Sequence, residues 1–233
     1  MIYYPHRCKL KLLLSIAIIT LSLSLLLSKV YATEGEEIET HQLGDSAKKE
    51  EGSFSKGGDT QRVPINLRSS HKALNSEDVK AMLQEYNFFS IDLNNRGNFK
   101  NDFERKRVNG VKVVIDRATG LMWHKSGSFK FLSWSDAKEW IEDLNQRGYA
   151  GNSDWRLPTT EEALSLLESR KRYGGLYIDP IFDKRQLYIW TGDTKEGSGE
   201  HVALSVYFDD AKIRWDETNS FNRNFVRPVR TSR

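Results

Sequence analysis

Hydrophobic residues recur every three to four positions in three segments of the chain, and each segment follows a residue that can cap a helix. These residues are Asn75 or Ser76, then Ser133, and then Thr159. Asn, Ser and Thr side chains accept the free N–H groups at a helix start, and apolar residues at this spacing share one face. The sequence therefore predicts three helices, with buried faces formed by Val79, Met82, Leu83 and Tyr86, by Trp134, Ala137, Trp140, Ile141 and Leu144, and by Ala163, Leu164 and Leu167.

Short segments of alternating or continuous apolar residues predict β-strands in the C-terminal half. Val111–Asp116 and Leu121–Trp123 flank a turn that ends at Gly120, which can adopt the left-handed backbone conformation that such turns need. Four later strands are expected at Leu187–Thr191, His201–Phe208, Lys212–Trp215 and Asn224–Arg230. Pro228 has no backbone N–H, so the last strand should lie at a sheet edge or contain a bulge. Helices followed by antiparallel strands predict an α+β fold.

The first 110 residues divide into three predicted parts. Residues 1–32 combine a basic start, an apolar run at Leu12–Leu27 and, in Val30-Tyr31-Ala32, small residues at the positions that matter for cleavage, a pattern typical of a secretory signal peptide. We expect cleavage after Ala32; the alternative is an uncleaved anchor, although a membrane span usually needs about 20 apolar residues. Residues 33–70 are rich in Glu, Gly, Ser and Lys and are expected to form a flexible linker. A helical lead-in at 71–110 then precedes a domain at 111–233. The lead-in contains a basic run with Lys100, Arg105, Lys106 and Arg107, which favours a solvated loop, with an anion-binding patch as the alternative.

The charge and cysteine content narrow the range of functions. The chain has 35 Lys and Arg and 32 Asp and Glu residues, but the predicted signal peptide holds four of the basic residues and none of the acidic ones. The remainder is therefore almost neutral, so the mature chain is not expected to bind polyanions through its bulk charge, although a local basic patch remains open, and no nucleic-acid partner is expected. The only cysteine, Cys8, also lies in the signal peptide. The mature protein would thus have no disulfide, thiol nucleophile or cysteine-ligated metal.

A stretch from Asn152 to Glu162 combines a turn, an aromatic–cationic pair and a helix start. Thr159 and Glu162 have the spacing of a capping box, in which each side chain binds the other residue's backbone N–H. Pro158 favours an extended conformation in the residue before it. Trp155 is expected in the core, and its neighbour Arg156 must find an acidic or carbonyl partner if it is drawn in.

Four motifs occur in a fixed order along the chain. They are Val114-Ile115-Asp116-Arg117-Ala118-Thr119-Gly120-Leu121-Met122-Trp123, Asp154-Trp155-Arg156-Leu157-Pro158-Thr159, Tyr188-Ile189-Trp190-Thr191 and Phe225-Val226-Arg227-Pro228-Val229-Arg230. Together they resemble the Lcl C-terminal domain family, named after a collagen-like bacterial adhesin. The resemblance covers about Val111 to Arg230 and implies a C-type-lectin-like fold, related to the formylglycine-generating enzymes, with two helices and a mainly antiparallel sheet. It also implies binding of sulfated polysaccharide. Pro228 stands where the family often has Cys, so the disulfide implied there is absent.

The motifs are expected to be structural rather than catalytic. No nucleophile elbow, zinc-protease motif, phosphate loop or dinucleotide fingerprint is present, and the formylglycine-generating enzymes work through cysteines that the mature chain lacks. His124 and His201 are far apart in sequence, and Asp116 and Asp154 each lie in a turn. We therefore expect no catalytic site, cofactor or metal. The structural set is Asp116, Trp123, Asp154, Trp155, Arg156, Pro158, Thr159, Glu162, Trp190, Arg227 and Arg230.

Ligand-binding residues are expected in the irregular segments Arg170–Asp183, Gly192–Glu200 and Trp215–Arg223. Sugar sites combine aromatic faces with fixed polar groups. The candidates of these types are Tyr173, Tyr177, Trp215, Asp216, Asn219, Asn222 and Arg223. A basic cluster at Arg170, Lys171 and Arg172 is the candidate for oxyanions, unless Glu161, Glu162 and Glu168 neutralise it. Trp215-Asp216-Glu217 is similar to the calcium-binding tripeptide of animal lectins, but its partner motif is missing and no calcium is expected.

The combined prediction is an exported, non-enzymatic binding module in the periplasm or at the cell surface. Its expected ligand is a carbohydrate, including sulfated or acidic polysaccharides. Two alternatives remain: an assembly module that binds an envelope protein, and an unrecognised enzyme, which would have a deep polar pocket with a perturbed carboxylate or histidine. Contact with a membrane is expected only through the N-terminal segment, if it stays uncleaved.

Overall fold

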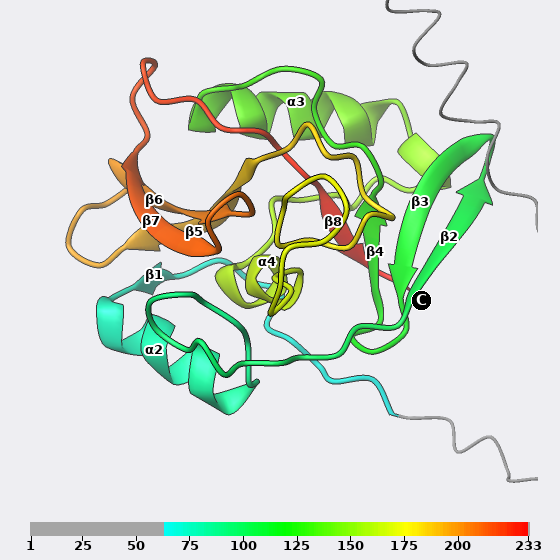
Figure 1. Cartoon of the computed structure of the whole chain (residues 1–233). Coiled ribbons are helices and arrows are strands. Elements are labelled where there is room, and N and C mark those ends of the chain that lie inside the picture. Colours follow the sequence, from blue (N-terminus) through cyan, green and yellow to red (C-terminus); the bar gives the residue numbers. More distant parts are fainter. Residues whose placement is uncertain (1–62, 233) are drawn as a thin grey trace, which may run out of the picture. The chain divides into compact units, whose positions relative to one another are not determined.

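The computed structural model describes residues 63–232 of the chain (Figure 1). Contacts along the chain separate residues 1–57 from residues 58–233, and the described residues belong to the second unit. The predicted signal peptide and most of the predicted linker lie outside the described residues. Within residues 63–232, no helix is long and apolar enough to cross a membrane.

The three α-helices of the described region begin at the caps that the sequence predicts. Asn75 and Thr159 form capping boxes, with Asp78 and Glu162 respectively, and Ser133 accepts the N–H of Asp136. The helices are α2 (Ser76–Glu85), α3 (Trp134–Gln146) and α4 (Thr160–Ser165), and a 3₁₀ helix, η1, covers Tyr149–Gly151. Their predicted apolar faces are buried, except that Tyr86 and Trp140 are only partly buried.

The strands form two four-stranded sheets. The first has the order β1 (Ala73–Leu74), β5 (Tyr188–Lys195), β6 (Val202–Tyr207) and β7 (Lys212–Glu217). The second has the order β2 (Phe103–Val108), β3 (Val111–Asp116), β4 (Leu121–His124) and β8 (Val229–Thr231). All neighbouring strands are antiparallel except β1 and β5. The fold is therefore α+β with mainly antiparallel sheets, as predicted.

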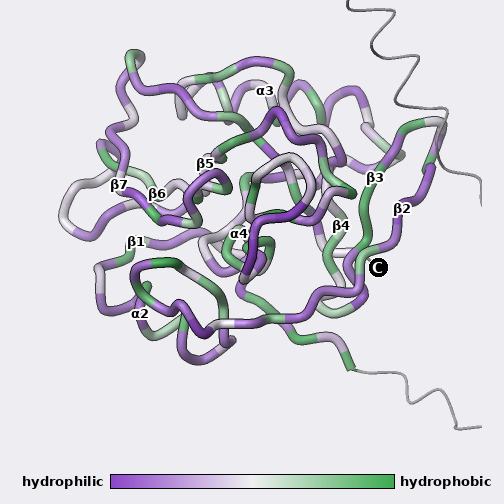
Figure 2. Tube along the Cα trace, in the orientation of Figure 1, coloured by the Kyte–Doolittle hydropathy of each residue, from purple (hydrophilic) through white to green (hydrophobic). Residues whose placement is uncertain are grey.

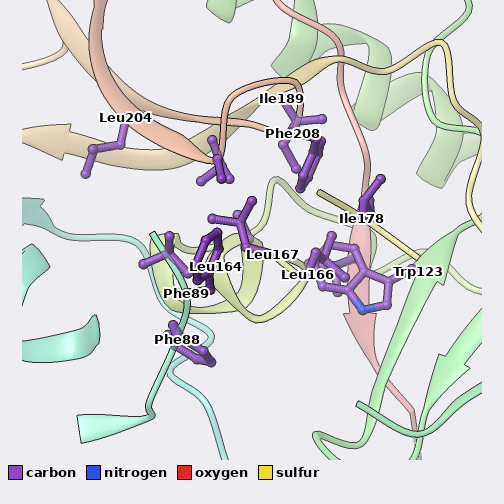
Figure 3. Close-up of a cluster of buried hydrophobic side chains, with 14 of the residues drawn as sticks. Phe88, Phe89, Trp123, Leu164, Leu166, Leu167, Ile178, Ile189, Leu204 and Phe208 are labelled. Atoms are coloured by element: carbon purple, nitrogen blue, oxygen red, sulfur yellow. The ribbon is translucent and has the colours of Figure 1, made fainter. Parts of the chain in front are cut away.

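The short helix α4 lies between the two sheets, and every one of its residues is buried (Figure 1). Leu164, Leu166 and Leu167 meet side chains from α2's end and from the first sheet in one hydrophobic cluster (Figure 3). A second cluster lies under α3. The motif tryptophans Trp123, Trp155 and Trp190, together with Trp134 of α3, belong to these clusters and have exposed fractions of at most 4%. Their predicted role in the core is confirmed.

Two boundaries differ from the predictions. The predicted helical lead-in contains strand β2, which pairs along its whole length with β3. Its side chains are mostly hydrophilic, whereas those of β3 are mostly hydrophobic (Figure 2), so hydrophobic periodicity could not reveal β2. The predicted linker also extends too far, because Leu67 is buried and Arg68 binds Glu161 and Asp193 in the folded unit.

The last predicted strand is shorter than expected. Only Val229–Thr231 forms β8, while Asn224 and Phe225 make isolated bridges to Leu132 and Ile189. Pro228 precedes β8, whose position at the end of the sheet order agrees with the predicted edge. The predicted loop from Gly192 is also partly a strand, because β5 continues to Lys195.

Candidate functional site

The motif residues Arg156 and Glu162 form a two-pronged ion pair at the start of α4. Both terminal nitrogens of Arg156 lie 2.6 Å from carboxylate oxygens of Glu162, which is fully buried. The same carboxylate accepts the N–H of Thr159, completing the capping box. Arg156 thus has the internal acceptor that the sequence predicts, and this part of the motif fixes the entry of the chain into α4.

The other motif residues also have structural partners. Arg230 donates to Asp154 at 2.6 Å, whereas Asp116 accepts the hydroxyl of Thr119 at 2.6 Å and the N–H of Asp102 at 2.8 Å. Burial raises the pKa of Asp116 against the lowering effect of these hydrogen bonds. The two carboxylates therefore serve separate turns and do not form a catalytic pair.

Arg227, from the last motif, is a fully buried cation. Its guanidinium donates to the carbonyl oxygen of Lys125 at 2.6 Å and stacks on Phe182 at 4.6 Å. Burial lowers the pKa of Arg227 to about 9, while the charge of Asp183 acts in the opposite direction. Arg227 remains protonated at neutral pH and contributes a positive potential to the neighbouring surface.

The predicted sugar-binding aromatics do not assemble into one site. Tyr177 stacks on Phe89 at 5.7 Å, and Trp215 packs against the cluster around α4, so both are partly buried. Tyr173, by contrast, is 88% exposed. Asn219 accepts the N–H groups of Phe221 and Asn222 within its own turn, and Arg223 donates to Ser220 in the same turn.

Asp216 lies on the other side of β7 from Trp215, where it accepts the hydroxyl of Tyr207 at 3.1 Å. Burial and the charge of Asp216 raise the pKa of Tyr207 to about 12. The Tyr207 ring stacks on Tyr188 at 4.7 Å, and Arg214 covers it at 3.8 Å. Neighbouring side chains therefore occupy the faces of this ring, which are not available to a sugar.

The predicted basic cluster after α4 is only partly neutralised, and not by the residues that the sequence suggested. Arg172 lies 3.8 Å from Asp179, and the ammonium of Lys171 lies 5.5 Å from the ring of Tyr177. Glu161 binds Arg68 and Glu162 binds Arg156, so the alternative that these two glutamates neutralise the basic cluster was wrong. Arg170 is exposed.

Four cations gather on one face of the second sheet, and we call them the strand patch: Arg105, Arg107, Lys112 and Lys125. Arg107 lies directly opposite Lys112 in the register of the antiparallel strands β2 and β3, and Arg105 lies two residues before Arg107 on the same face. Leu121 and Trp123 of β4 are paired with Asp116 and Val114 of β3, which lie on the same face as Lys112. Lys125 immediately follows β4, two residues after Trp123, so it lies on this face as well.

The electrostatics of Lys125 show that these charges act on one another. Burial lowers the pKa of Lys125, and the charges of Arg105, Lys112 and Arg227 lower it further, while Asp183 opposes them. Asp183 itself is committed to Arg185, whose hydrogen bonds hold the pKa of Asp183 at about 2. Within residues 63–232, no carboxylate forms an ion pair with any member of the strand patch.

Arg105 and Arg107 belong to the basic run for which the sequence favours a solvated loop, with an anion-binding patch as the alternative; the structure places both residues on strand β2 instead of a loop. A second sequence signal could have shown this pairing. Asn109-Gly110 lies between Val108 and Val111, and Asn-Gly is a strong signal for a two-residue hairpin turn. Both residues have positive φ, 47° and 81°, as this turn requires. The hairpin fixes the register that places Arg107 opposite Lys112.

A pocket of about 440 Å³ lies elsewhere on the unit, between α3, β5 and residues 71–73. Of the individually named site residues, only the motif residue Arg156 lines it, but Gly192, Thr194 and Glu200 come from the predicted segment Gly192–Glu200. The pocket is not lined by any of the carboxylates or the histidine whose pKa values are shifted. These residues are Asp116, Asp183, Asp193 and His124. Within residues 63–232, no group of three or more His, Cys, Asp or Glu side chains has an arrangement that could hold a metal ion.

Comparison with known proteins places the second unit in one family. The sequence profile described as the Lcl C-terminal domain matches residues 112–230, about half of the chain. Neither the curated proteins nor the solved structures contain a significant match.

Proposed function

The chain belongs to the Lcl C-terminal domain family, and we propose that it is a non-enzymatic binding module for anionic carbohydrate, which it engages through the strand patch. The observation that carries this proposal is the strand patch itself, in which four cations share one sheet face without a carboxylate partner among residues 63–232. Holding like charges together costs free energy, which a polyanionic ligand would recover.

The geometry of the strand patch favours a polymer with repeated anionic groups. Residues two apart on a strand are separated by roughly 7 Å, and directly paired residues by about 5 Å. Arg105, Arg107 and Lys112 therefore present charges at regular intervals on an open surface. Arginine binds sulfate and carboxylate groups through two parallel hydrogen bonds, and two of the four cations are arginines.

The family resemblance supports carbohydrate as the source of these anions. It implies sulfated polysaccharide. The nearly neutral charge of residues 33–233 gives no general attraction for polyanions, so binding rests on the local charge of the strand patch. The motif carboxylates and arginines have structural partners, which supports a binding module rather than an enzyme. Export to the periplasm or the cell surface is part of the proposal and rests on the N-terminal sequence.

The proposal is tested by retention on a heparin–agarose column eluted with a salt gradient. The test variant carries Arg105→Gln, Arg107→Gln and Lys112→Gln, all at exposed positions. The matched control carries Lys80→Gln, Arg96→Gln and Arg147→Gln, which removes three exposed cations elsewhere. We expect the test variant to elute at clearly lower salt than the wild type, and the control to elute close to the wild type.

Two outcomes would overturn the proposal. One is passage of the wild-type protein through the column at low salt. The other is equal elution of the test and control variants, because bulk charge rather than the strand patch would then determine retention. A dextran column without sulfate groups separates anion recognition from general sugar binding, and no retention is expected on it.

A further inference from the structure

The pocket beside α3 has an apolar floor. Trp134, Ile141 and Leu157 are buried lining residues, with exposed fractions of 3 to 5%. The indole N–H of Trp134 is already bonded to the carbonyl oxygen of Thr191 at 2.9 Å, so its ring can serve only as an apolar or π surface. Small-molecule sites typically enclose roughly 300–1,000 Å³ above such a floor, and the pocket's volume of about 440 Å³ lies in this range.

The wall formed by residues 71–73 is held firmly in place. The His71 Nε2–H donates to the carbonyl oxygen of Leu157 at 2.9 Å, and the imidazole lies so close to Gly192 that a Cβ there would be 2.2 Å from Nε2. The backbone N–H of Lys72 donates to Asp193 at 2.8 Å, and its carbonyl oxygen accepts from Thr194. The pocket is therefore built by the folded unit rather than by chance at a loose surface.

The charged groups at the rim differ in whether they have partners. Lys138 pairs with Glu200 at 3.0 Å and lies 3.5 Å above the Trp134 ring, and Arg156 is bound to Glu162. Within residues 63–232, the side chains of Lys72 and Glu142 have no ion pair or hydrogen bond. The pocket thus presents one free ammonium group and one free carboxylate, from different elements, above one apolar floor.

We infer that this pocket binds the zwitterion of an α-amino acid with an apolar side chain. The ligand's carboxylate pairs with Lys72, its ammonium group pairs with Glu142, and its side chain lies against Ile141 and Leu157, beside the Trp134 ring, one face of which Lys138 covers. A ligand with only a negative charge would be repelled by the carboxylates of Glu142 and Glu200, and a ligand with only a positive charge would be repelled by Lys72 and Lys138. This site is separate from the strand patch and does not depend on the proposed carbohydrate binding.

The test is a titration followed by NMR of the six indole N–H groups of the protein. The Trp134→Phe variant assigns the Trp134 signal, and Trp215, which does not line the pocket, provides the internal reference. We expect L-leucine to shift the Trp134 signal in a saturable way and to leave the Trp215 signal unchanged. Glycine carries the same charges without the apolar group and should bind about tenfold more weakly.

Matched ligands and variants test each charge separately. N-acetyl-L-leucine lacks the ammonium group and L-leucinamide lacks the carboxylate, so each should bind about two- to fivefold more weakly than leucine. Lys72→Gln should weaken the binding of leucine by a similar factor but should not weaken the binding of leucinamide, which has no carboxylate to lose a partner. Glu142→Gln should likewise weaken the binding of leucine but not that of N-acetyl-leucine. The exposed Lys80→Gln and Glu139→Gln variants are the charge-matched controls.

The inference fails if leucine does not shift the Trp134 signal, or if glycine and leucine bind equally well. It also fails if either pocket variant weakens all four ligands alike, because Lys72 and Glu142 would then not contact the groups assigned to them. None of these results bears on the strand patch, since both pocket variants should elute from heparin–agarose close to the salt concentration of their matched controls.

Discussion

Arg156 and Glu162 are joined by two hydrogen bonds of 2.6 Å, between a guanidinium that is 22% exposed and a carboxylate that is fully buried. Glu162 also caps α4 through the N–H of Thr159. One carboxylate thus connects the extended segment before Pro158 with the helix between the two sheets. The family motif that contains Arg156 is therefore explained by folding.

Replacing Arg156 by Met should destabilise the protein by about 3–5 kcal/mol. The substitution keeps much of the side-chain volume but leaves the buried charge of Glu162 with backbone donors alone. Urea unfolding followed by circular dichroism measures the loss. The control is Arg117→Met, which breaks an exposed pair with Glu104 and should cost no more than about 1 kcal/mol. Equal losses in the two variants would contradict this account.

Trp155→Ala should lower the free energy of unfolding by about 3–5 kcal/mol. The side chain is 2% exposed, its indole N–H donates to Tyr149 at 2.9 Å, and its ring packs edge-on against the Tyr149 ring. Trp140→Ala, at a partly buried position of α3, is the comparison and should cost less. A thermal melt of Trp155→Ala that matches the wild type would show that the motif does not stabilise the fold in this way.

Arg68→Met should destabilise the protein most strongly at neutral pH. Arg68 binds two buried carboxylates, Glu161 and Asp193, and its removal leaves them ionised without a cation, at a cost of about 3–5 kcal/mol. Burial raises the pKa of Asp193, but the hydrogen bonds from Arg68 and from backbone N–H groups outweigh it and lower that pKa overall, so this stabilisation is present above pH 4 and is lost as pH falls. The difference in unfolding free energy between the wild type and Arg68→Met should therefore be smaller at pH 3. A deficit that does not change with pH would contradict an electrostatic role.

His124 should make the protein less stable in mild acid. Burial, and then the charge of Arg227, lower the pKa of His124 to about 4, so the folded state holds a neutral imidazole that stacks on Tyr149 and accepts the N–H of Gly127. Stability is fully present above pH 6.5 and falls as pH drops towards 4, by at most about 3 kcal/mol. Unfolding free energies at pH 7 and pH 4.5 should differ less in His124→Gln than in the wild type. Equal differences would show that His124 is not responsible.

Local signals in the sequence were sufficient to predict the helices and the motif chemistry. The caps at Asn75, Ser133 and Thr159 depend on residues within three positions, and so does the capping box of Glu162. The burial of Trp155 and the need of Arg156 for an internal acceptor follow from the cost of burying large apolar and charged groups. These properties belong to single segments of the chain.

The candidate site depended on contacts between distant segments and could not be predicted in the same way. Tyr177 and Trp215 have the composition of a sugar site, but packing against Phe89 and the core cluster covers much of their surface. The strand patch appears only when the β2–β3 hairpin aligns Arg105 and Arg107 with Lys112. The two-residue turn at Asn109-Gly110 was the one local signal for this pairing.

The salt dependence of binding to a heparin oligosaccharide, measured by calorimetry at several salt concentrations, tests whether the strand patch contacts the ligand. Each cation that contacts an anionic group should contribute about one unit to the slope of log Kd against log salt concentration. Arg105→Gln, Arg107→Gln and Lys112→Gln together should reduce this slope by up to about three, while the control with Lys80→Gln, Arg96→Gln and Arg147→Gln should retain the wild-type slope. A slope that is unchanged in the strand-patch variant would contradict the account.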